Sequence, residues 1–264
     1  MSAFVTVVCL LSYGFAHYYS TPAPEFRLWP ELSLTTATMT ALIGSNVLIC
    51  ALWRFVPLWP LLTRYFMHVP GYPRAIQAVA NVFSHVQYEH LLGNMFMLLL
   101  VGPVCHELVG RGVFVGTYVA SGAVGTLFSL YWANLGRGSI SAHSVGASAA
   151  IWGISTLFCL LTDMNSIKIP FMKDMEFSFH PKMLLAAFIG LEIYSSLRRK
   201  QTSMDHASHF GGMFVGASAA GYLHLNGWHQ RSSLRGAQGK TVDVEKTVRE
   251  EIKEVKDSVV KVVK

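Results

Sequence analysis

The chain has 264 residues, of which 52% are apolar and only 14% are charged, and its formal net charge is +6. A soluble domain carries about 25% charged residues, so this composition excludes an ordinary soluble globular protein and favours the lipid bilayer as solvent. Lys and Arg fall in loops and in the tail, as at membrane ends, and no basic stripe interleaved with aromatic residues indicates nucleic-acid binding.

Seven apolar segments are candidate membrane spans, since a spanning helix needs about 20 mostly apolar residues. The first, residues 2–19, lacks the charged start and the small-residue cleavage site of a signal peptide, and is interpreted as an extra N-terminal span. Six core spans follow at residues 34–56, 86–105, 113–135, 145–161, 183–197 and 209–225. The predicted fold class is therefore all-α, a polytopic membrane helix bundle.

The connections between the spans divide the chain further. Gly110-Arg111-Gly112 predicts a tight helical hairpin, and residues 57–85 form a long loop, rich in Pro and aromatic residues, that is expected at the membrane interface. Beyond residue 228 the composition becomes polar, and valines recur at helical spacing in an amphipathic tail. The predicted regions are an N-terminal segment and linker, 1–33, a core, 34–228, and a charged tail, 229–264.

The four cysteines predict neither a disulfide framework nor a zinc site. Each lies in an apolar run without a C-x-x-C spacing, so they are interpreted as small buried hydrophobic residues. They are Cys9, Cys50, Cys105 and Cys159.

Polar side chains near the starts of alternate spans are the candidate functional residues, because such groups are costly inside a membrane. His90 and Asn94 lie near the start of core span two, Ser148 near the start of span four and His209 at the start of span six. These three spans run in the same direction, so the side chains lie at similar depth under one face. The sequence thus predicts a pocket that combines a serine, a histidine base and two further hydrogen-bond donors.

Small residues on spans four and six predict that these two helices approach closely. Gly212 and Gly216 follow His209 on its own helix face, and Gly146 stands just before Ser148. Close approach allows the nucleophile and the base to come within about 3 Å of each other. Trp152, one turn after Ser148, is expected to pack its ring beneath the imidazole.

Acyl-transfer chemistry follows from these residue types. Ser148 would attack a peptide carbonyl, and His209 would accept its proton and return it to the leaving amine. His90, Asn94 and the backbone N–H of Ser148 are the candidate donors for the oxyanion.

These residues resemble the signature of the rhomboid proteases: His90-x-x-x-Asn94, Gly146-x-Ser148 and His209-x-x-Gly212-x-x-x-Gly216 on alternate spans. Residues 46–54, 64–66 and 205–212 also resemble the mitochondrial branch, the presenilin-associated rhomboid-like proteins, which carry an extra span before the six-span core. The resemblance implies a Ser–His dyad enzyme of the mitochondrial inner membrane. It implies single-span transmembrane proteins in the lipid bilayer as substrates, and no metal or cofactor.

The sequence departs from the family pattern at two places. Ala149 follows the nucleophile, where the family usually has Gly, and its methyl group is expected to alter slightly the tightness of the helix contact or the oxyanion geometry. An Arg-rich amphipathic presequence is also not seen at the N-terminus, so the mitochondrial assignment rests on the core.

Other functions are compatible with parts of the sequence. A catalytically inactive rhomboid-like protein that binds membrane clients is the main alternative, although nucleophile and base are both present. A transporter would place polar groups through the full depth of the bundle. His106-Glu107 does not continue into H-E-x-x-H, which argues against a metalloprotease.

Three more polar residues are interpreted as structural rather than catalytic. Asp205, one turn before His209, is expected to cap the helix or to be a solvated charge, rather than to complete a triad. His206 is interpreted as structural or interfacial. Glu192 is expected, like Glu89, to be near-surface or bundle-facing rather than catalytic.

Overall fold

The structure is a computed structural model that describes residues 1–162, 164, 167–168, 178–197, 204–227 and 253. Its long helices are α1 (Ser2–Tyr18), α2 (Leu34–Leu52), α5 (Tyr88–Val109), α6 (Arg111–Asn134), α7 (Ser148–Leu161), α8 (Pro181–Leu197) and α9 (His206–Leu225). They confirm the predicted all-α bundle with a helix ahead of the six core spans. The amphipathic tail lies outside the described residues except for Lys253.

Shorter elements fill the connections. They are η1 (Pro24–Phe26), η2 (Val56–Leu58), α3 (Trp59–Phe66), α4 (Gln77–Ala80), η3 (Asn81–Phe83), and the strands β1 (Ile167–Lys168) and β2 (Ser178–Phe179). The two strands pair antiparallel, with Ile167 opposite Phe179. The loop predicted at residues 57–85 is thus largely a chain of short helical turns.

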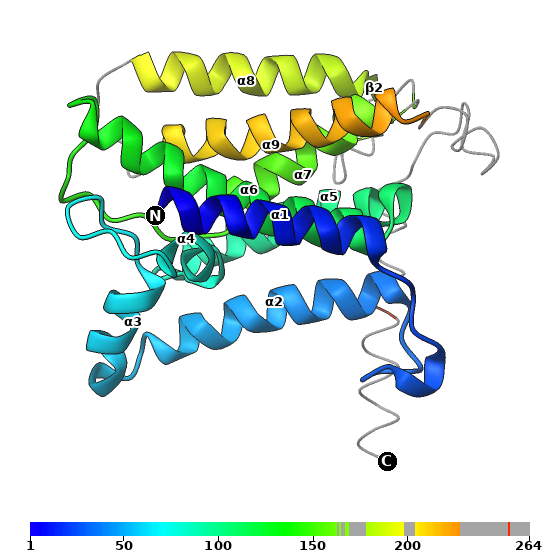
Figure 1. Ribbon diagram of the computed structural model, residues 1–264, viewed down its shortest axis with the longest axis horizontal. Coiled ribbons are helices and arrows are strands. Elements are labelled where there is room, and N and C mark those ends of the chain that lie inside the picture. The colour runs from blue at the N-terminus through cyan, green and yellow to red at the C-terminus, as the bar shows by residue number, and fades with distance from the viewer. Residues whose placement is uncertain (163, 165–166, 169–177, 198–203, 228–252, 254–264) are drawn as a thin grey trace.

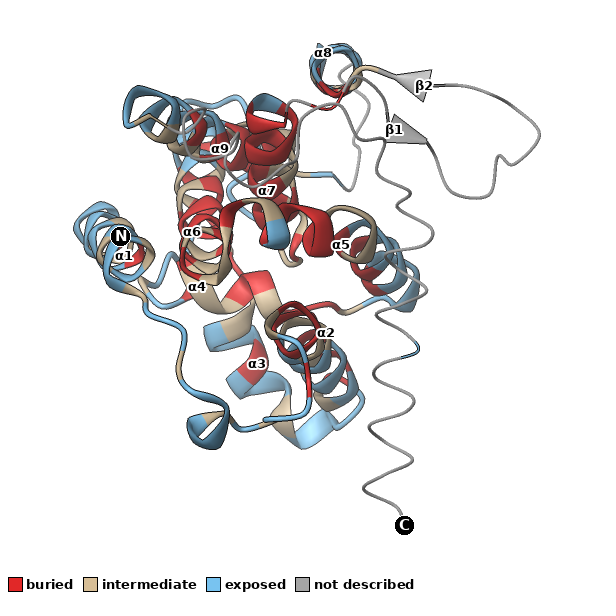
Figure 2. Ribbon diagram, turned by 90° about the vertical axis from the view of Figure 1, so that its right-hand side faces the viewer, coloured by how far each residue is buried: buried red, intermediate tan, exposed pale blue. Residues whose placement is uncertain are grey.

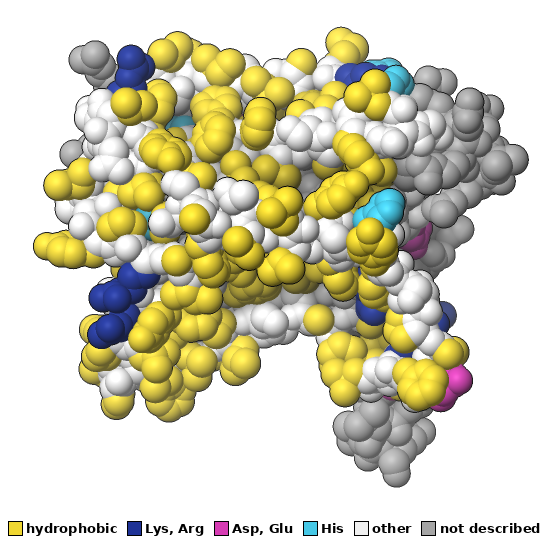
Figure 3. Space-filling view, in the orientation of Figure 1, with side chains coloured by type: hydrophobic (Ala, Val, Ile, Leu, Met, Phe, Trp, Pro, Cys, Tyr) yellow, Lys and Arg dark blue, Asp and Glu magenta, His cyan; other side chains and the backbone are white. Residues whose placement is uncertain are grey.

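The long helices run side by side, in alternating directions (Figure 1). Helices α5, α7 and α9 begin at the same end of the bundle, which is the arrangement that brings the predicted polar residues to one depth. By length and composition, α2, α5 and α6 are apolar enough to cross a membrane. Hydrophobic side chains cover the face over α1 and α9 in Figure 3, and the basic side chains lie toward the helix ends. The chain is a polytopic membrane protein.

Helix α7 forms the centre of the bundle. It contacts α5, α6, α8 and α9, and most of its residues are buried. Figure 2 shows the same buried interior in α5, α6 and α9, whereas α1 and α8 are largely exposed. Within α8 the buried residues are Pro181, Leu185 and Glu192. A buried glutamate on an otherwise peripheral helix therefore marks the side of α8 that faces the bundle.

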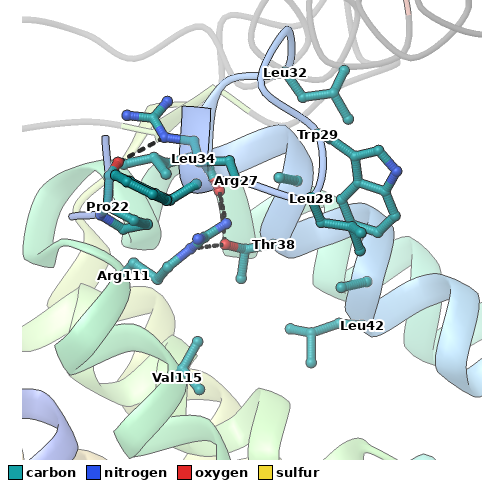
Figure 4. A pocket seen from close by; sticks show the side chains of 13 residues that line it. Pro22, Arg27, Leu28, Trp29, Leu32, Leu34, Thr38, Leu42, Arg111 and Val115 are labelled. Atoms are coloured by element: carbon teal, nitrogen blue, oxygen red, sulfur yellow. Dashed lines mark hydrogen bonds between the residues drawn. The ribbon is translucent and has the colours of Figure 1, made fainter. Parts of the chain in front are cut away.

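The tight hairpin predicted at residues 110–112 is confirmed. Gly110 has a φ of +84°, which favours glycine, and it ends α5 and begins α6. Arg111 then holds α2, because its guanidinium donates to Thr38 Oγ1 at 2.8 Å and to the Leu34 carbonyl at 3.1 Å. Both bonds are visible in Figure 4, where they border a cavity of about 410 Å³ between the first turns of α2 and α6.

The long loop before α5 is fastened to the segment that precedes α7. His68 N–H donates to the Ser144 carbonyl at 3.0 Å, and Ser144 N–H donates back at 2.8 Å. In α3, Leu62 is buried while Trp59 and Tyr65 are exposed, as expected for a helix at the membrane interface. The loop therefore braces the backbone that leads to Ser148.

The cysteines all lie in the described part of the chain and all are free thiols. Cys50, Cys105 and Cys159 are buried, as predicted, and Cys9 is half-buried.

Candidate active site

The seam between α7 and α9 is a contact of backbone on backbone. A Cβ atom at Gly212 would lie 2.0 Å from the Ala149 carbonyl oxygen, and one at Gly216 would lie 2.1 Å from the Gly153 carbonyl oxygen. Any side chain at either position would separate the helices. The small residues predicted to allow close approach thus stand where the two helices touch.

The close seam brings the hydroxyl of Ser148 to the imidazole of His209. Ser148 Oγ and His209 Nε2 are 2.9 Å apart, so the predicted contact is present. Ser148 is the first residue of α7 and is half-buried, whereas His209 is only 4% exposed. This geometry allows direct proton transfer from the hydroxyl to the ring.

Asp205 begins helix α9 and does not reach the imidazole through a described hydrogen bond. Its carboxylate accepts from the Ser208 N–H at 3.1 Å, which is the role of an N-cap. The interpretation of Asp205 as a cap is confirmed.

Trp152 fills the space beside the base. Its ring centroid lies 5.9 Å from that of His209, with the planes tilted by 42°, and 5.8 Å from that of Phe188 on α8. One indole therefore contacts rings from both α8 and α9 and limits the rotation of the imidazole.

The proposed oxyanion donors on α5 lie beside the segment that leads into Ser148, together with His85, a residue that the sequence did not single out. Asn94 Nδ2 donates to His85 Nε2 at 2.9 Å, and the Ala147 N–H approaches the same nitrogen at 3.4 Å. Because Nε2 accepts, His85 carries its proton on Nδ1, which has no hydrogen-bond partner among the described residues. Burial lowers the pKa of His85 to about 3, with a smaller contribution from His90, so the ring is neutral.

Gly146 lets the chain pass tightly under His90. Its φ is +126°, and a Cβ atom there would lie 2.7 Å from Cε1 of His90. The Gly146 N–H donates to the carbonyl of Asn81 in η3 at 3.0 Å. The backbone entering α7 is thereby fixed, and the Ser148 N–H, in the first helical turn, has no acceptor within its own helix. That N–H is available to a ligand oxygen.

Glu192, which the sequence predicts to be near-surface or bundle-facing rather than catalytic, contacts the proposed base. Its Oε1 lies 2.9 Å from His209 Nδ1, and its Oε2 is hydrogen-bonded to His206 Nδ1. The expectation that Glu192 faces the bundle is confirmed. The signal available in the sequence was a glutamate inside span five, close to the end that meets the start of span six.

Glu192, His206 and His209 also form the one group of potential metal ligands found in the described residues, with ligand atoms within 4.8 Å of one another. The two Nδ1 atoms and the two carboxylate oxygens of this group are hydrogen-bonded to one another.

Comparison with known proteins agrees with this architecture. Residues 73–226 match the family model of the rhomboid domain. Rhomboid protein 1, mitochondrial, of Saccharomyces cerevisiae is 29% identical over 204 residues, which cover 76% of this chain and 57% of the relative. Presenilin-associated rhomboid-like protein A, mitochondrial, of Danio rerio is 29% identical over 207 residues, 78% of this chain and 53% of the relative.

A bacterial relative is similar over a shorter region. Rhomboid protease AarA of Providencia stuartii is 28% identical over 149 residues, 52% of each chain. The chain thus spans about half the length of the curated relatives that it matches.

Proposed function

This chain belongs to the rhomboid family, and we propose that it is an intramembrane serine endopeptidase whose nucleophile is Ser148 and whose general base is His209. The observation that carries the proposal is the distance of 2.9 Å between Ser148 Oγ and His209 Nε2, at the starts of two helices of a membrane bundle. Support also comes from the relative whose name identifies it as a rhomboid protease.

The reaction follows from this pair. The Ser148 oxygen bonds to the peptide carbonyl carbon while its proton passes to His209 Nε2, and the carbonyl oxygen takes the negative charge. When the C–N bond breaks, His209 returns the proton to the amine. Water then cleaves the acyl-enzyme by the same route, with His209 again accepting and returning a proton. The chemistry uses no metal and no cofactor.

The oxyanion would be bound on the side of α5. The Ser148 N–H, the Asn94 amide and the His90 ring are the proposed donors, and His85 holds the Asn94 amide in place. The first turns of α5, α7 and α9 add a favourable dipole for negative charge. Donors held rigidly in this way are what stabilises the charge that develops during acyl transfer.

The proposed substrates are single-span proteins of the same membrane, cut within or beside their transmembrane segments. The proposed location is the mitochondrial inner membrane, in protein processing. It is supported by relatives named as mitochondrial that align with more than three quarters of this chain.

The rival function is that of an inactive relative that binds membrane clients. Such a protein has no need of a serine hydrogen-bonded to a histidine or of a constrained turn at Gly146. Both features are present here, and they favour the enzyme.

The test is cleavage of a single-span substrate by the purified full chain in detergent. Wild-type protein is expected to cut it, while Ser148→Ala and His209→Ala each abolish cleavage, because one removes the nucleophile and the other its base. A chelator is expected to leave the rate unchanged. Cleavage that survives Ser148→Ala, or a folded wild-type protein that binds the substrate without cutting it, would refute the proposal.

A further inference from the structure

Glu192 of helix α8 places its carboxylate beside Nδ1 of His209, the ring nitrogen that faces away from Ser148. Glu192 is 6% exposed, although its neighbours Leu191 and Ile193 are 59% and 46% exposed. Its buried side faces the first turn of α9, where Oε1 meets His209 and Oε2 meets His206. A buried acidic side chain in a membrane bundle is costly unless partners satisfy it, and here both oxygens have one.

We infer that Glu192 is a positioning residue that completes a Ser148–His209–Glu192 triad. This inference rests on the proposed function, and it extends the two-residue mechanism expected for the family. The His209 ring contacts both partners directly: Ser148 Oγ lies 2.9 Å from Nε2 of the ring, and Glu192 Oε1 lies 2.9 Å from Nδ1.

The carboxylate selects the tautomer of the base. An ionised carboxylate only accepts hydrogen bonds, so His209 must present its proton on Nδ1 toward Glu192. Nε2 then carries the lone pair and can accept the Ser148 proton. A ring protonated on Nε2 instead would face the hydroxyl with a donor and could not act as its base.

The same carboxylate stabilises the charged ring during the reaction. When Ser148 Oγ bonds to the carbonyl carbon, its proton resides on Nε2 and the imidazolium stays beside the negative charge of Glu192. Glu192 gains no proton at any step, and the leaving amine takes the proton from Nε2. In a bundle with low local dielectric this attraction exceeds its value in water.

His206 fixes the position of the carboxylate. Its hydrogen bond to Oε2 leaves Oε1 for His209, and His206 lies three residues before His209 on the same helix. The two histidines thus hold both oxygens of Glu192 against α9. Trp152, between Phe188 and His209, closes the remaining side of the ring.

The test compares Glu192→Ala and Glu192→Gln with Leu185→Ala, each in the full chain in detergent. Leu185 is the other large buried side chain of α8, so its truncation loosens the helix without touching the triad. Glu192→Ala is expected to lower kcat by about 10²–10⁴-fold with little change in KM, as for loss of the acid in a triad. Glu192→Gln should recover part of kcat, since its amide oxygen still accepts from Nδ1. Leu185→Ala should lower thermal stability and retain kcat within about fivefold.

A second readout does not depend on cleavage. Nitrogen-15 NMR of histidine-labelled protein reports which ring nitrogen carries the proton, with the His209 signal assigned by its loss in His209→Gln. Wild-type protein should show the Nδ1–H tautomer, and Glu192→Ala should show the Nε2–H form or a mixture. If wild-type protein shows the Nδ1–H form but cuts nothing, the proposed protease activity fails while the positioning role stands.

Two results would overturn the inference. One is a His209 ring whose tautomer is unchanged in Glu192→Ala. The other is a kcat that falls equally in Glu192→Ala and Leu185→Ala, which would make Glu192 a packing contact for α8.

Discussion

Ser148 and His209 each lie near the first turn of a helix, where neighbouring backbone N–H groups lack acceptors within the helix. Two sets of contacts hold the nucleophile and its base in place. The His209 ring is held from behind by Glu192 and from the side by Trp152, while the backbone before Ser148 is held by Asn81 and His85. Ser148 is only half-buried. Its hydroxyl is therefore accessible to a peptide bond, as a nucleophile must be.

Asn94 offers a test of the oxyanion side. Asn94→Ala removes a proposed donor and is expected to lower kcat by about 10²–10³-fold, since loss of one oxyanion donor has that effect in serine proteases. The matched control is Asn134→Ala, at the exposed end of α6. Steady-state cleavage of one substrate by both variants gives the comparison. An Asn94→Ala enzyme within about threefold of wild type would remove Asn94 from the oxyanion site.

Among single residues, the sequence predicts contacts that follow from the spacing of residues along one helix, or from side chains that lie at the same membrane depth on parallel spans. The approach of Ser148 to His209 follows from parallel spans and small residues, and it is present. The sequence did not single out His85, and it did not predict that Glu192 contacts His209, for a different reason. Their partners depend on how a loop folds back over α5 and on how far α8 is displaced along α9, and neither is encoded in a local pattern.

Helices α7 and α9 depend on glycine for their contact, which gives a prediction at the level of elements. Gly212→Ala places a methyl group against the Ala149 carbonyl, and backbone cannot yield as a side-chain end can. The helices must separate, so cleavage is expected to fall by about tenfold or more, because nucleophile and base need near-contact geometry.

Gly221→Ala is the control on the same helix, because a Cβ atom there meets nothing within 4 Å. It should keep wild-type activity and gain slightly in helix stability. Cleavage rates and melting temperatures of Gly212→Ala and Gly221→Ala, measured under identical conditions, test the role of the seam. Equal activity of the two variants would show that the seam has no role in the reaction.

Ala149 directs its methyl group at a third helix, α6, beside this seam. The methyl group that departs from the family pattern is buried and faces Gly125 of α6, where a Cβ atom would lie only 2.7 Å away. A glycine on the neighbouring helix thus provides the space for the extra methyl group. The sequence could identify the departure but not the helix that accommodates it.

Element boundaries show the same limit. The fourth core span was predicted from residue 145, and helix α7 begins at Ser148. The physical reason is Gly146, whose φ of +126° is not helical, so the helix can start only after it. Long apolar runs therefore predicted which helices exist, whereas the strained turn that sets the exposure of the nucleophile was visible only in the structure.

The whole molecule should lose stability as the solution becomes acidic. His68 and His85 are fully buried in the loop between α3 and α5, and burial lowers the pKa of both. In the unfolded chain each has a pKa of about 6.5. At pH values between about 6.5 and the folded-state pKa of His85, about 3, His85 binds a proton in the unfolded chain but not in the folded protein.

The two buried neutral histidines therefore leave the free energy of unfolding undiminished above a pH of about 6.5. Below that pH the free energy of unfolding falls, by up to about 1.4 kcal/mol per pH unit for each histidine. Thermal unfolding of the protein in detergent, followed from neutral pH to about pH 5, measures this slope. His68→Gln should flatten it, because one of the two groups no longer titrates. A melting temperature that stays constant or rises on acidification would contradict the assignment of both rings as buried and neutral.

The bundle as a whole presents the reacting groups under one membrane face, since α5, α7 and α9 begin at the same end (Figure 1). This common origin was predicted from the alternation of spans alone. The packing of α1 was not: it lies along α6, where Gly112 and Gly116 approach its backbone, and away from the proposed site.

The most direct test of the central claim is labelling of the intact protein with a fluorophosphonate probe, followed by mass spectrometry to locate the modified residue. The account predicts covalent modification of Ser148 in wild-type protein and loss of that modification in His209→Ala, because only a serine activated by its base reacts. Folded wild-type protein that remains unlabelled, or labelling of Ser148 that persists without His209, would contradict it.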